Sequence, residues 1–104
     1  MTKPANPARG EASLTIDGQE FLLRPTFEAL VAAEEELGSL FTVVEQAAEG
    51  ALTMAQMAGL LWHCLPVQDR PERSDVGTAV LRLGLVEAAK HLRIVLSQII
   101  KGSQ

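Results

Sequence analysis

The chain has 104 residues, of which 47% are hydrophobic, 21% charged and 4% aromatic, and its formal net charge is −4 at pH 7. This length is typical of one compact domain, and the apolar fraction excludes a chain that is disordered throughout. The single cysteine excludes an internal disulfide, and the acidic balance disfavours nucleic acid as a partner because phosphates require a basic surface.

A β-hairpin is predicted over residues 11–24. It follows an N-terminal arm, residues 1–8, whose prolines and lack of apolar periodicity favour flexibility. Polar and apolar residues alternate on both sides of Asp17-Gly18, a pair that favours a tight turn with positive φ. The apolar positions of the two strands are Ala12, Leu14, Ile16, Phe21 and Leu23. Because a two-stranded ribbon is only marginally stable in water, the rest of the chain must cover its apolar face.

Five helices are expected after the hairpin, and glycines mark several of their ends. Their predicted ranges are 26–37, 39–48, 53–65, 74–83 and 85–101. The residues expected to cap the first four are Thr26, Ser39, Thr53 and Ser74, and Gln56 gives Thr53 the spacing of a capping box. The segment 66–73, PVQDRPER, contains two prolines and four charged residues, which predicts a flexible linker.

The apolar positions of the helices indicate how the bundle packs. The third helix is apolar nearly all round, so we expect it to be central, with Trp62 filling the core. In the first helix, the glutamates at 34–36 are expected to face away from the buried side, which is formed by Phe27, Leu30, Val31 and Leu37. In the last helix, apolar residues fill about half of the circumference, which predicts a core face with a rim left for a partner.

These elements together predict an α+β fold. An N-terminal two-stranded antiparallel β-hairpin packs on a bundle of about five short α-helices, in a single domain over residues 9–104. The stretch 81–100 is the longest candidate for membrane insertion, but charged residues interrupt it, so we expect no membrane partner. The cysteine usage fits a cytoplasmic protein.

Charge is segregated along the chain. Residues 25–65 carry six glutamates and no lysine or arginine, whereas the part after residue 65 carries six basic and four acidic residues. One interpretation is a solvated acidic face, complemented in the folded protein by Arg73, Arg82, Lys90 or Arg93. The other is a docking face for a basic partner.

The residues that could carry chemistry are His63, Cys64, His91 and the glutamates. His63 and Cys64 are neighbours, so on a helix their side chains point about 100° apart and cannot both bind one metal ion. Consecutive glutamates also fan out around a helix and form no acid–base pair. We therefore expect no catalytic residue, no metal site and no cofactor. Both histidines are expected to be structural.

The order of segments resembles a known family. The chain reads ANPARGE, then two strands around DG, then LRPTFEAL, EEELG, LTMAQMAGLLWHCL and LRLGL before a final helix. This order, from about Asn6 to Ile100, resembles the small tail proteins of gene transfer agents and related tailed phages, which are grouped with phage tail assembly chaperones. His63 and Cys64 stand where the family is expected to have small residues.

The resemblance implies a non-enzymatic role in tail assembly. It implies a chaperone that binds the tape-measure protein in the cytoplasm of the bacterial host. The alternative is a structural, tube-associated subunit that is retained in the tail of the particle. Tape-measure and tail tube proteins are the implied partners, and self-association is left open.

A chaperone for a long helical client would offer an apolar groove, so the candidate partner-binding residues lie on the apolar faces of the helices. They are Leu37, Leu40, Phe41, Leu92, Val95, Ile99 and Ile100. The alternative interpretation of this set is that its members pack on one another in the core.

Overall fold

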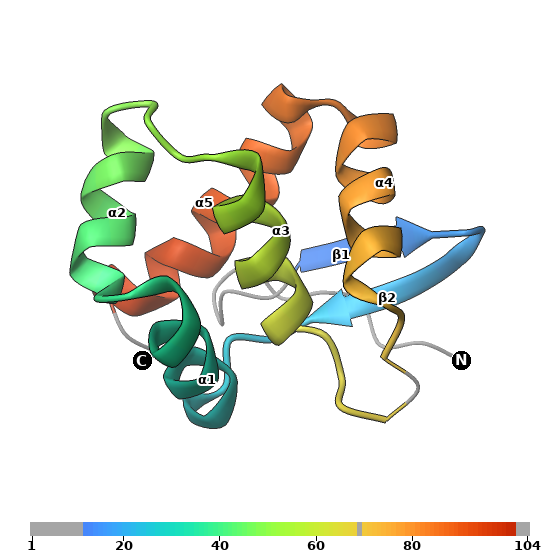
Figure 1. Ribbon diagram of the computed structural model, residues 1–104, viewed down its shortest axis with the longest axis horizontal. Helices are drawn as coiled ribbons and strands as arrows, with labels where there is room; N and C mark the ends of the chain where they lie inside the picture. The colour runs from blue at the N-terminus through green and yellow to red at the C-terminus, as the bar shows by residue number, and fades with distance from the viewer. Residues whose placement is uncertain (1–11, 69, 102–104) are drawn as a thin grey trace.

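The computed structural model describes residues 12–68 and 70–101, with side chains up to Ser97. The elements follow in the order β1 (Ala12–Ile16), β2 (Gln19–Leu23), α1 (Phe27–Leu37), α2 (Leu40–Ala48), α3 (Met54–His63), α4 (Arg73–Leu83) and α5 (Leu85–Lys101) (Figure 1). The fold is α+β, as predicted, with one hairpin and five helices in the described part of the chain. The arm predicted for residues 1–8 lies outside the described residues.

The hairpin has the predicted turn. β1 and β2 pair antiparallel, from Ala12 opposite Leu23 to Ile16 opposite Gln19. Asp17 and Gly18 both have positive φ, 51° and 78°, which matches the right-handed twist of the flanking strands. Because side chains alternate across a strand, the buried face collects Ala12, Leu14, Ile16 and Leu23.

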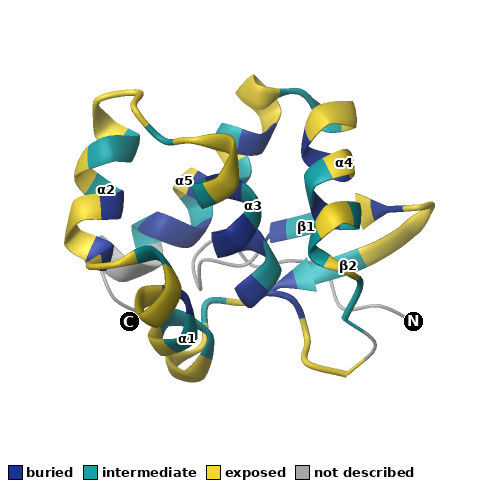
Figure 2. Cartoon of the chain, in the orientation of Figure 1, coloured by how far each residue is buried: buried dark blue, intermediate teal, exposed yellow. Residues whose placement is uncertain are grey.

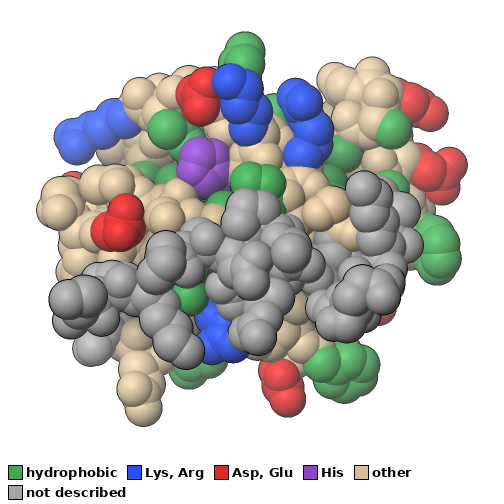
Figure 3. Space-filling view, turned by 180° about the vertical axis from the view of Figure 1, so that it is seen from behind, with side chains coloured by type: hydrophobic (Ala, Val, Ile, Leu, Met, Phe, Trp, Pro, Cys, Tyr) green, Lys and Arg blue, Asp and Glu red, His purple; other side chains and the backbone are tan. Residues whose placement is uncertain are grey.

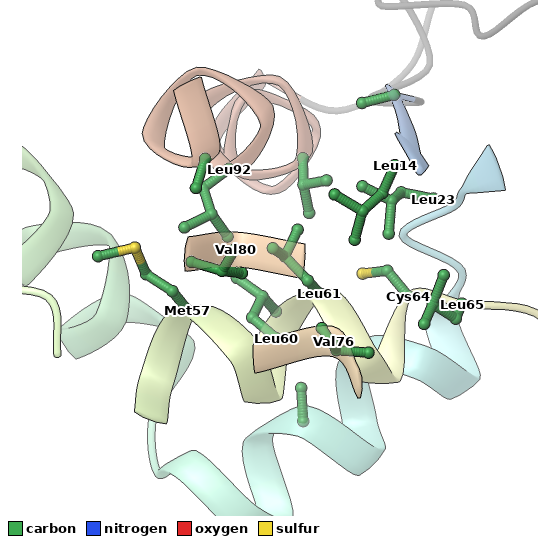
Figure 4. Packing of buried hydrophobic residues seen from close by; sticks show 14 of the residues in the cluster. Leu14, Leu23, Met57, Leu60, Leu61, Cys64, Leu65, Val76, Val80 and Leu92 are labelled. Carbon is green, nitrogen blue, oxygen red and sulfur yellow. The ribbon is translucent and has the colours of Figure 1, made fainter. Parts of the chain in front are cut away.

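The helices cover this apolar face of the hairpin. β1 packs against α4 and α5, while α3 lies in the middle of the molecule and contacts α1, α4 and α5 (Figure 1). Figure 4 shows how side chains of β1, β2, α3, α4 and α5 meet in one cluster. The largest fully buried side chains are Leu14, Leu23, Val43, Leu60, Leu61, Val76, Val80, Leu92 and Val95. In the described part of the chain, no helix combines the length and apolarity needed to span a bilayer.

Local capping explains where three helices begin. Thr26 Oγ1 accepts the backbone N–H of Ala29, and Thr53 and Gln56 form the complete predicted capping box. Ser39 lies at the N-cap of α2 but makes no side-chain cap; instead the carboxylate of Glu34 accepts the N–H of Leu40, at 3.0 Å. A glutamate expected to face away from the bundle therefore stabilises the start of the next helix.

The start of α4 differs from the prediction. Its N-cap residue is Glu72, and Ser74 lies within the first turn, where its carbonyl accepts the hydroxyl of Thr78. The Ser74 cap is therefore wrong. The helix begins one residue earlier, at Arg73, whose side chain contacts Glu36 of α1 and Trp62 of α3.

The buried side of α1 is also narrower than predicted. Leu30, Ala33 and Leu37 face the core, but Phe27 and Val31 are exposed. In Figure 2 much of α1 has the colour of exposed residues. Val31 lies about 100° around the helix from Leu30, so the packing face against α3 leaves it outside. α1 thus presents two apolar side chains to solvent.

Candidate functional site

The structure separates the seven predicted partner-binding residues. Leu92 and Val95 are fully buried, Leu40 is buried and Leu37 is half-buried, so these residues pack in or against the core. The side chains of Ile99 and Ile100 lie outside the described residues. A partner could contact Leu92 or Val95 only if α5 left the core. Phe41, 83% exposed, is the member of the described set that is free to meet a partner.

Other large apolar side chains are exposed that the sequence interpretation did not select. Phe27 is 78% exposed on α1, one turn before Val31, and Val86 is 71% exposed at the start of α5. The full set in the described residues is Phe27, Val31, Phe41, Met54, Val67, Leu81, Leu85 and Val86. Single exposed apolar residues are normal, but Phe27 and Phe41 are large aromatic side chains, a type that is enriched at protein interfaces.

A groove separates the second half of α2 from α5. Its volume is about 550 Å³, and it is lined by Val44, Ala47, Ala48, Gly50, Arg93, Leu96 and Ser97. Most of this lining is small or apolar, and Arg93 is the one charged side chain among the described residues that line it. The groove therefore suits an apolar segment that also carries a carboxylate.

The charge segregation of the sequence persists on the surface. Glutamates lie on α1 and α2, whereas Arg82, Lys90 and Arg93 lie on α4 and α5. Figure 3 shows basic side chains gathered along the upper part of the rear face, and acidic side chains beside a hydrophobic one at its right-hand edge. Among the residues with described side chains, the glutamate–cation pairs are Glu36 with Arg73 and His63, and Glu87 with Lys90. Most of the acidic surface is therefore not neutralised within the described part of the chain.

Trp62 holds Arg70, Pro71 and Arg73 against α3. The guanidinium carbons of Arg70 and Arg73 lie 4.3 Å and 4.5 Å from its ring centroid. Its indole N–H donates to the carbonyl of Pro71, at 2.9 Å. Trp62 is half-buried and packs against the core, so the prediction that it fills the core is wrong. Its ring and its N–H instead anchor residues 70, 71 and 73, which belong to the predicted linker.

Glu36 joins three elements through its carboxylate. It accepts a hydrogen bond from Arg73, at the start of α4, and one of 2.8 Å from His63 Nε2, at the end of α3. The hydrogen bond from Arg73, and then that from His63, lowers the pKa of Glu36 from 4.5 to about 2. The expectation that Glu36 faces away from the bundle is therefore wrong, and the complementation of an acidic helix by Arg73 is confirmed.

Acid should weaken the fold through Glu36. Because its pKa is lower in the folded state, its stabilising contribution is complete above pH 4.5 and is lost as the pH falls toward 2. Between pH 5 and pH 2.5, the free energy of unfolding should therefore fall by about 1 kcal/mol less in Glu36→Gln than in the unsubstituted protein. This value is reduced for solvent screening, because the pair is partly exposed. Urea unfolding at both pH values measures this difference. Glu35→Gln, on the exposed side of the same helix, is the control and should leave the acid loss unchanged.

The residues considered for chemistry form no reactive centre. Cys64 is 2% exposed, and burial raises the pKa of its thiol to about 12, so it is not a nucleophile at neutral pH. His63 is buried and bound to Glu36, and His91 Nδ1 lies 2.8 Å from the carbonyl of Glu87. In the described residues, no three His, Cys, Asp or Glu side chains are placed to hold a metal ion.

Comparison with known proteins gives one match. A family model described as phage tail tube protein, GTA-gp10, matches residues 9–102. No curated protein and no solved structure matches the chain. The match covers both strands and all five helices of the described fold.

Proposed function

Because this chain belongs to the GTA-gp10 family of phage tail tube proteins, we propose that it is a structural subunit retained in the tail of a gene transfer agent or related phage. Membership confirms the resemblance to such tail proteins that the order of segments indicates. The family description agrees better with the structural alternative than with a chaperone for the tape-measure protein, which was the main expectation from the sequence.

The exposed apolar side chains of α1 and α2 support a structural subunit. Phe27 is 78% exposed on α1, a helix with four glutamates, and Phe41 is 83% exposed at the start of α2. A subunit that is buried in an assembly needs such anchors, since aromatic side chains provide much of the binding energy of protein interfaces. The partners in this proposal are other tail proteins, including further copies of the chain. The protein resides in the host cytoplasm before assembly and in the particle afterwards.

Quantitative mass spectrometry of purified particles tests this proposal. A structural subunit should be present in many copies per particle, in a constant ratio to the other tail proteins. If the protein is absent from particles but co-purifies with the tape-measure protein from producing cells, the structural proposal fails and the chaperone hypothesis replaces it.

A further inference from the structure

We propose that copies of this chain associate head to tail, with α1 of one copy docked in the groove between α2 and α5 of the next. The inference rests on the proposed function, because the subunits of a tube contact one another. It adds the surface through which they do so.

The stripe of α1 has the form of a groove-binding helix. Phe27 and Val31 are four residues apart, so both project from the same side of α1. They are 78% and 37% exposed, and they lie outside the face that packs on α3. Glu35 continues this side by one further turn and is also exposed. A helix that docks through residues spaced by four presents this pattern.

The groove can accept such a helix. Ala47, Ala48 and Gly50 on one wall and Ser97 on the other are small, so the backbone of a docked helix can approach closely. Leu96, which is buried, provides an apolar floor. The volume, about 550 Å³, accommodates both apolar side chains of the stripe.

Charge identifies a second copy as the occupant. Arg93 lines the groove and has no ion-pair partner within the part of the chain that the structure describes. Glu35 is likewise unpaired among the described residues. A docked α1 would bring its acidic end toward Arg93 on α5. Since the stripe and the groove are different surfaces, the contact is heterologous and can repeat from copy to copy.

Cross-linking between two labelled forms of the full chain tests the contact. One form carries Glu28→Cys, beside the stripe, and the other carries Ala48→Cys, at the groove. Cys64 does not interfere, because burial raises the pKa of its thiol to about 12. A short bismaleimide should link the two forms when they are mixed, and should link neither form to itself. Failure of the mixed pair to react above the level of the separate forms would overturn the docking.

Substitutions then test which side chains carry it. Phe27→Ala in the first form, or Arg93→Glu in the second, should weaken association about tenfold. Pairing Glu35→Arg with Arg93→Glu should restore cross-linking, because the ion pair is re-formed with its charges exchanged. Val86→Ala, a matched control at another exposed apolar position, should change nothing. Equal loss in this control, or no loss with Phe27→Ala, would contradict the proposal. These outcomes are independent of whether particles contain the protein, so the two proposals can fail separately.

Discussion

Replacing Leu61 with alanine should lower the free energy of unfolding by about 3 kcal/mol. Leu61 is fully buried in α3, the helix that contacts α1, α4 and α5, so its truncation leaves a cavity at the point where these elements meet (Figure 4). Urea unfolding followed by circular dichroism measures the effect. A domain of this size has a total stability of about 5–15 kcal/mol, so the variant should unfold at a markedly lower urea concentration.

The matched control for Leu61 is Leu81, which is 63% exposed on α4. Leu81→Ala removes the same atoms from a helix but leaves no cavity, so its effect should stay within about 0.5 kcal/mol. If both variants lost the same stability, α3 would not be the centre of the core. The architecture described above would then be incorrect.

Replacing Trp62 with alanine should have the second largest effect, about 2–3 kcal/mol, because it removes a large, half-buried ring together with its contacts. Trp62→Phe keeps an aromatic ring but loses the hydrogen bond to Pro71, so it should cost about 1 kcal/mol. Circular dichroism is the suitable probe, since both variants lose the only tryptophan.

Trypsin provides a second readout for Trp62. Arg73 is held over the indole ring and bound to Glu36, so the bond after it should resist cleavage in the native protein. In Trp62→Ala this bond should be cut several times faster, while Trp62→Phe should lie between the two. Unchanged cleavage in Trp62→Ala would mean that Arg73 is held by other contacts.

Local signals explain which features the sequence predicts well. The turn at Asp17-Gly18 and the capping box of Thr53 and Gln56 each depend on residues that are adjacent or three apart, so they can be recognised without a fold. The contact between Glu36 and Arg73 joins residues 37 positions apart. It arises only once α1, α3 and α4 are packed, and no periodicity indicates it.

The candidate site shows the same limit. The wide apolar stripe of α5 indicates a buried face, but it does not say whether the core or a partner buries it. β1, α3 and α4 pack against α5, and Leu92 and Val95 are therefore core residues. The groove beside α2 depends on how far two helices stand apart, which a sequence pattern does not encode. One signal was available: Phe27 lies at the edge of its helical stripe, in the first turn, where neighbours on α1 are fewest.

Locating the chain in intact particles tests the central claim most directly. Val67, 81% exposed and outside both the α1 stripe and the α2–α5 groove, can be replaced by cysteine and labelled with maleimide-coated gold, while Cys64 stays unreactive. Electron microscopy of particles built with Val67→Cys should show repeated gold labels on the tails. Labelled protein found only in the unassembled fraction, with bare tails, would contradict the assignment of this chain as a structural tail subunit.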